Sequence, residues 1–141
     1  MSAAGYSGTP LWKKLGLKSG GSLLLIGAPE GWVVPDPPAD VGTVSVPSLA
    51  ADSDPAATIL AFFTERAQIA RDIVELGERI FPAGAVWIAW PRRAGGHESD
   101  IREQDIRDIA LPLGLVDVKV AALDQDWSGL RLVWRKDRRH T

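Results

Sequence analysis

The chain has 141 residues, of which 45% are hydrophobic and 24% charged, and a formal net charge of -2. This length suits one domain with a proper core, and the weak negative charge makes non-specific binding to nucleic acid or to anionic membranes unexpected. There is no cysteine, which excludes disulfides, thiolate metal sites and cysteine nucleophiles.

The N-terminal part of the chain predicts an arm, a short helix and a buried strand. Residues 1–9 are small and polar, which is typical of an extended arm. Residues 10–17 predict a short helix, because Pro10 is tolerated in a first turn and Gly16 ends it. Residues 22–26 are mostly apolar and lie between glycines, which is typical of a strand buried on both faces.

The next part of the chain, residues 33–56, predicts an irregular segment rich in proline. Its sequence Pro35-Asp36-Pro37-Pro38 removes backbone donors and fixes φ at three positions. Within it, residues 43–46 predict a short edge strand. Residues 57–63 are apolar and predict a central strand of the sheet.

Two helices with a strand between them follow. Residues 65–81 predict a helix with one apolar stripe, made by Ile69, Ile73, Leu76 and Ile80. Residues 84–90 are an apolar run that stops at Pro91, which predicts another strand. Residues 99–113 predict the second helix, with Ser99 as its N-cap residue.

The C-terminal part predicts a hairpin and a tail. Residues 116–123 and 130–134 predict two strands joined by a polar loop over residues 124–129, a link too short for a parallel crossover. Residues 135–141 are a basic tail, expected to be solvated. Residues 1–141 therefore predict a single α/β domain, a Rossmann-like three-layer sandwich whose mostly parallel sheet ends in an antiparallel hairpin.

This order resembles a class I methyltransferase that has been cut down. In the resemblance, residues 23–31 are the first strand and its glycine loop, residues 57–63 and 84–90 are the fourth and fifth strands, and the hairpin is the sixth and seventh. It implies a cofactor, S-adenosylmethionine (SAM), beside the loop. The sequence departs from that pattern, because Ala28, Pro29 and Glu30 lie between only two glycines. Residues 32–53 leave no room for the usual helices and strands, so the resemblance implies a reduced cofactor site.

Six short segments spread along the chain carry a second resemblance: residues 5–11, 13–16, 27–29, 87–91, 113–117 and 127–131. Through them the chain resembles a bacterial family of domains of unknown function. This resemblance implies kinship and no particular chemistry.

The candidate ligand site lies where the parallel strands end, since ligands of open parallel sheets bind outside the carboxyl ends of their strands. The residues expected there offer backbone amides, charge and an indole for an anion or a planar ring: Gly27, Glu30, Gly31, Trp90, Arg92 and Arg93. The hairpin loop adds Asp126 and Trp127. The alternative for each is structural: a turn glycine, a packed indole, solvated arginines, and an aspartate that bonds local amides.

No catalytic or metal-binding set can be assembled from the sequence. His97 with Glu98 lacks the ligand count of a zinc site, and no serine has an identifiable histidine partner. Lys13 and Lys14 could face a phosphate, although a solvated pair is the commoner arrangement. We therefore expect no resident metal and no cofactor unless SAM is bound.

Three functions remain open. The first is a non-catalytic module that binds an unidentified small ligand or protein partner in the cleft at the strand ends. The second is a SAM-dependent methyltransferase with a reduced site, and the third is a homo-oligomer with an interface over residues 33–48. Nucleic acid and membrane partners are not expected. Residues 1–20 lack the apolar part of a signal peptide, and no apolar run is long enough for a membrane span, so we expect a soluble cytoplasmic protein.

Overall fold

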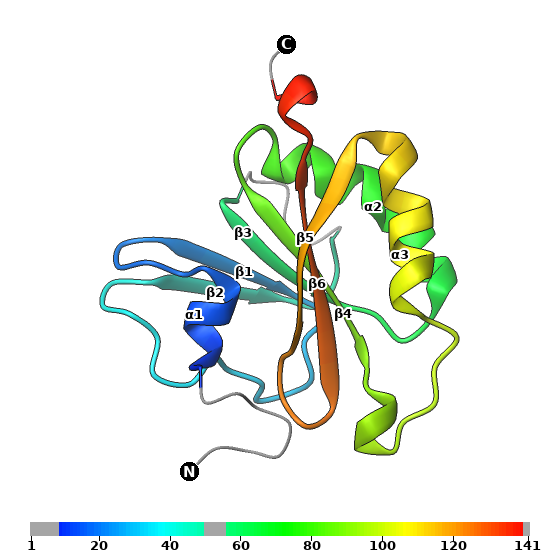
Figure 1. Cartoon of the computed structure of the whole chain (residues 1–141). Helices are drawn as coiled ribbons and strands as arrows, with labels where there is room; N and C mark the ends of the chain where they lie inside the picture. The colour runs from blue at the N-terminus through cyan, green and yellow to red at the C-terminus, as the bar shows by residue number, and fades with distance from the viewer. Residues whose placement is uncertain (1–8, 50–55, 140–141) are drawn as a thin grey trace.

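The computed structural model describes residues 9–49 and 56–139. Most of the predicted arm over residues 1–9, the end of the irregular segment over residues 33–56 and the last two residues of the basic tail lie outside the described residues. The rest is one sheet with helices beside it (Figure 1).

The sheet has six strands in the order β2-β1-β3-β4-β6-β5. Their bounds are Ser22–Ile26 for β1, Gly42–Val46 for β2, Thr58–Phe62 for β3, Ala85–Pro91 for β4, Leu115–Ala122 for β5 and Trp127–Trp134 for β6. The first four strands pair in parallel, whereas β6 pairs antiparallel with both β4 and β5. The predicted Rossmann-like α/β class with its C-terminal hairpin is confirmed.

Two helices cover one face of the sheet (Figure 1). Helix α2, Arg66–Ile80, turns its predicted apolar stripe inward, and Ile69, Ile73, Leu76 and Ile80 are each at most 1% exposed. Helix α3, Glu103–Ala110, adds Ile106 to the same core. Among the described residues, no helix has the length and apolar content needed to cross a membrane.

The other face has far less helix. Helix α1, Leu11–Leu15, is five residues long and ends at Gly16, whose φ of 80° is left-handed as predicted for a helix end. It packs Leu15 onto Trp87 of β4, whose indole Nε1 donates to the Leu15 carbonyl at 3.3 Å. The remainder of this face is covered by the irregular chain before β2, which contributes Trp32, Val34 and Val41.

Two predicted boundaries are wrong near the second helix. Helix α3 begins after Arg102, and Ser99 caps no helix, since its hydroxyl accepts from the Ile101 amide at 3.1 Å. The extended backbone there lets Ile101 reach the core, where it is 2% exposed. At the other end, Leu111–Leu113 is a 3-10 turn, because Pro112 has no N–H to continue an α-helix.

The hairpin is also tighter than predicted. Strand β6 begins at Trp127, so three residues of the expected loop belong to the sheet. The Asp124 carboxylate closes the turn by accepting from the amides of Asp126 at 2.7 Å and Trp127 at 2.8 Å. This aspartate turn brings Trp127 directly opposite Pro91 of β4.

At the junction between α2 and β4, we expect one added methyl group to lower the stability of the protein. A Cβ at Gly84 would lie 2.8 Å from the Ala57 carbonyl oxygen and 2.9 Å from that of Ile80, both of them backbone atoms. We expect Gly84→Ala to lower the free energy of unfolding by about 1–3 kcal/mol. Gly42→Ala is the matched control, because a Cβ there has no heavy atom within 4 Å. Urea unfolding of both variants measures the difference, and equal effects would contradict the packing described.

Candidate functional site

A cavity of about 490 Å³ lies at the carboxyl ends of β1, β2 and β3. Its walls come from the residues that end or follow these strands, and from α2 and β6: Ile26, Gly27, Pro47, Ser48, Leu49, Phe62, Phe63, Thr64, Gln68, Arg71, Asp72 and Trp127. The chain runs from β1 to β2 on one side and returns to β3 on the other. The cavity is therefore at the point where the strand order reverses, the usual ligand position in open α/β sheets.

Gly27 shapes the mouth of this cavity. Its φ of 68° is a left-handed conformation that side chains rarely adopt. A Cβ on Gly27 would lie 3.4 Å from the Phe62 carbonyl oxygen and 3.8 Å from that of Pro47. The glycine thus keeps the space between the three strand ends open.

The N-terminus of α2, which borders the cavity, is already occupied by groups of the chain itself. Glu65 and Gln68 form a capping box, and the Gln68 side-chain oxygen accepts from the Glu65 amide at 3.2 Å. The Arg66 amide donates to the Asp100 carboxylate at 2.8 Å. An anion would therefore meet acidic side chains at this helix end.

Other polar groups of the cavity face solvent. Ser48 and Thr64 are exposed residues that place hydroxyl groups in the wall. Arg71 binds Asp72 through Nε at 2.9 Å, yet 69% of its side chain is exposed. Asp72 raises the pKa of the Arg71 guanidinium through this hydrogen bond, so the cation is permanent. The wall offers two hydroxyls and the Arg71–Asp72 ion pair beside apolar side chains.

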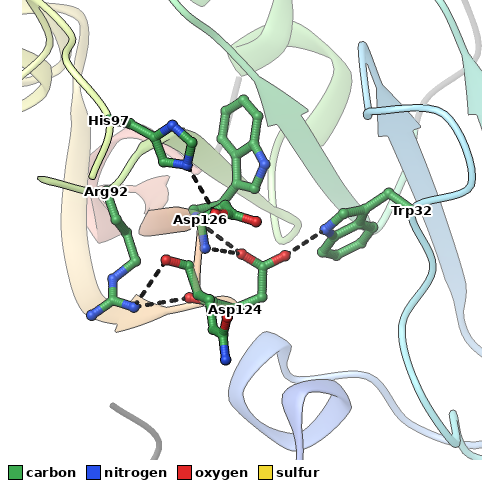
Figure 2. Close-up of polar contacts among 7 residues, drawn as sticks. Trp32, Arg92, His97, Asp124 and Asp126 are labelled. Atoms are coloured by element: carbon green, nitrogen blue, oxygen red, sulfur yellow. Dashed lines mark hydrogen bonds and ion pairs between the residues drawn. The ribbon is translucent and has the colours of Figure 1, made fainter. Parts of the chain in front are cut away.

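The loop after β1 is hydrogen-bonded to the turn between β5 and β6 (Figure 2). The Trp32 indole Nε1 donates to the Asp124 carboxylate at 2.9 Å. The Trp32 ring also meets Phe62 edge-on at 5.0 Å between centroids, and Phe62 meets Trp127 at 4.9 Å. This aromatic row leads from the loop to the floor of the cavity.

Arg92 is also hydrogen-bonded to the turn between β5 and β6 (Figure 2). Its Nη1 donates to the carbonyl oxygens of Asp124 at 3.1 Å and Gln125 at 3.4 Å. The Arg92 guanidinium is directed to this turn, and Arg92 does not line the cavity.

The structure brings two of the eight predicted site residues to the cavity, Gly27 and Trp127. Glu30 and Gly31 are exposed in the loop outside its lining, and Trp90 is 8% exposed in the core on the helix face. Arg92 holds the turn, and Arg93 and Asp126 lie near His97. Sequence reasoning missed the residues after β2 and on α2: Ser48, Leu49, Gln68, Arg71 and Asp72. Of these residues, Ser48 is the one that could have been proposed from the sequence, because it is a polar residue just after a predicted strand.

His97 and Asp126 form an exposed pair (Figure 2), and His97 also lines a second, shallower hollow. His97 Nε2 lies 2.8 Å from the Asp126 carboxylate, and the two side chains are 44% and 59% exposed. The nearby Ser99 hydroxyl is directed to the Thr64 carbonyl at 3.5 Å and so is no nucleophile for the pair. Within residues 9–49 and 56–139, no three metal-ligating side chains come together.

Lys14 is a structural cation. It is 9% exposed, and its Nζ donates to the Ala122 carbonyl of β5 at 3.3 Å. Burial lowers the pKa of Lys14, and the charges of Lys119 and Arg92 lower it further. Lys14 therefore ties α1 to the hairpin and does not face the cavity.

Comparison with solved structures gives the fold family. A SAM-dependent methyltransferase from Aquifex aeolicus is 15% identical, with 85% of each chain covered and a TM-score of 0.55. Magnesium protoporphyrin IX methyltransferase from Synechocystis PCC 6803 with bound SAM is 12% identical, covering 83% of this chain and 71% of that one, with a TM-score of 0.57. The fibrillarin pre-rRNA processing protein of Methanococcus jannaschii is 13% identical over 89% and 69%, with a TM-score of 0.54.

No protein-family model matches the chain, and no curated protein matches it by sequence. The expected kinship with a bacterial family of domains of unknown function stays a prediction. At these identities the similarity concerns the fold alone.

We expect substitution of Asp124 to destabilise the protein more than substitution of Asp126, the other aspartate of the turn. Asp124→Ala removes three hydrogen bonds, to Trp32, Asp126 and Trp127. We expect it to lower the free energy of unfolding by about 1–3 kcal/mol and to speed hydrogen exchange in the loop after β1. Asp126→Ala, the control, removes an exposed ion pair worth about 1 kcal/mol at most. Similar exchange rates in the two variants would show that Trp32 is held by something else.

Proposed function

We propose that the chain is a non-catalytic domain that binds a small ligand in the cavity at the ends of β1, β2 and β3. The observation that carries this proposal is the cavity itself, about 490 Å³ at the point where the strand order reverses. That volume is in the range of small-molecule sites. The position is the one at which this architecture usually binds ligands.

The chemistry of the wall favours a ligand with an apolar, planar part and a carboxylate or phosphate. Phe63, Leu49 and Trp127 supply apolar surface. The exposed guanidinium of Arg71 can pair with an anionic group, and the hydroxyls of Ser48 and Thr64 can bond to polar atoms. The titratable lining residues, Arg71 and Asp72, bind each other, which leaves neither of them poised as a general base.

SAM fits this wall in part. Its carboxylate and its adenine ring suit Arg71 and the apolar side chains, and one protein of similar fold holds bound SAM. In class I methyltransferases an acidic residue at the end of the second strand binds the ribose hydroxyls, whereas here Pro47, Ser48 and Leu49 directly follow β2. Between Gly31 and β2 the chain forms no helix, so the glycine loop is not followed by a helix N-terminus whose amides could face the cofactor.

The second candidate is a SAM-dependent methyltransferase with a reduced cofactor site. Its support is the methyltransferase fold together with a cavity in the position of the ligand site. In such a reaction an acceptor attacks the methyl carbon of SAM and S-adenosylhomocysteine leaves. This chain would then have to bind cofactor and acceptor in one cavity.

Calorimetric titration with SAM and S-adenosylhomocysteine tests the site. We expect saturable binding that Arg71→Ala weakens about tenfold or more, the effect of losing one charge-assisted hydrogen bond of about 1.5–3 kcal/mol. Arg66→Ala is the matched control, because it removes the same charge from the same helix outside the cavity lining. Binding that both substitutions weaken equally would place the ligand elsewhere.

A flat titration at high concentration would remove both adenosyl compounds as ligands, and with them the methyltransferase candidate. Release of S-adenosylhomocysteine from SAM, lost in Arg71→Ala, would overturn the non-catalytic assignment in favour of the methyltransferase. Binding without release would support the module.

A further inference from the structure

Strand β2 is an edge of the sheet, and among residues 9–49 and 56–139 it pairs with β1 alone. The Gly42 amide donates to the Gly21 carbonyl at 3.0 Å, and the Val46 carbonyl accepts from Gly27 at 2.9 Å, so both residues face β1. Backbone direction alternates along a strand, so Val44 also faces β1. The N–H and C=O groups of Thr43 and Ser45 therefore point outward, away from the sheet.

The two edges of this sheet differ in how they are protected. The β5 edge carries Asp117 and Lys119 and has a register shift between them, features that prevent a further strand from pairing. Strand β2 pairs with β1 in unbroken register, and residues 41–48 include no charged side chain. Val44 at its centre is 52% exposed. Within the part of the chain that the structure describes, the β2 edge therefore has neither the charged side chains nor the register shift of the β5 edge.

We propose that a second copy of this chain occupies the β2 edge, with the two β2 strands antiparallel about a twofold axis through Val44. In this register Thr43 lies opposite Ser45 of the second copy, and the two residues exchange both backbone hydrogen bonds on each side of the axis. Val44 lies opposite Val44 of the second copy as a non-hydrogen-bonded pair, where side chains are close. The twelve strands then form one continuous sheet.

The sequence around the axis is self-complementary. Gly42 falls opposite Val46, and Asp40 falls opposite Ser48, so the pairing sets no like charges against each other. Pro47 has no N–H to donate, which limits the ladder to the centre of the strand. A twofold contact of this kind uses the same surface on both copies and closes after two.

The mass of the full chain in solution is the first test. Light scattering should show a rise with concentration towards twice the monomer mass of 15.2 kDa. Val44→Lys places a charge on the twofold axis and should hold the chain at the monomer mass. Val118→Lys, at a residue that is 50% exposed on the β5 edge, is the matched control and should still dimerise.

Cross-linking tests the register. The chain has no cysteine, so Val44→Cys introduces a single thiol. Oxidation should convert most of Val44→Cys to a disulfide-linked dimer and little of Val118→Cys. Only in Val44→Cys would the thiol lie beside the same thiol of the second copy. Ser45→Pro removes an outward N–H that the β1 ladder does not use, so it should abolish the dimer while circular dichroism stays unchanged.

A monomer at every concentration would overturn the proposal, and so would a dimer in which Val118→Cys cross-links as readily as Val44→Cys. Neither result bears on ligand binding in the cavity.

Discussion

A parallel sheet must be buried on both faces, and within the described residues the helices are long enough to cover only one. Helices α2 and α3 cover that face, whereas the other relies on the five residues of α1 and on the irregular chain that follows Gly27. This irregular segment has no regular backbone hydrogen bonding of its own to fix its path. Trp32 supplies the anchor, with its ring against Phe62 and its N–H on the Asp124 carboxylate. The second layer of the fold depends on that contact.

The same anchor shapes the candidate site. Since the loop after β1 is drawn towards the hairpin turn, it does not wrap around a ligand at the strand ends. The cavity is left with walls from the ends of β1, β2 and β3 and from α2. Among the described residues that line it, Arg71 is the one cation.

The strands and the long helix could be predicted because each has a local pattern. Residues 22–26 match β1, and the helix predicted over residues 65–81 matches α2 within one residue at either end. The site could not be predicted in the same way. Arg92 follows a strand end as expected, but its direction is set by carbonyl groups more than thirty residues away in the hairpin turn. Arg71 and Gln68 lie in the predicted helix outside its apolar stripe, and only the packing of α2 against the sheet brings them to the cavity. Ser99 is a residue type that often caps helices, yet α3 begins at Glu103, after Ile101 has entered the core.

The central claim is that the cavity at the ends of β1, β2 and β3 binds the ligand. Backbone amide chemical shifts, followed by nuclear magnetic resonance while S-adenosylhomocysteine is added, test it most directly. The account predicts that the largest changes fall on Gly27, Ser48 and Thr64, with the amides around His97 unmoved. Changes centred on Gly96 and His97 would contradict it, since they would place the ligand in the hollow beside the His97–Asp126 pair.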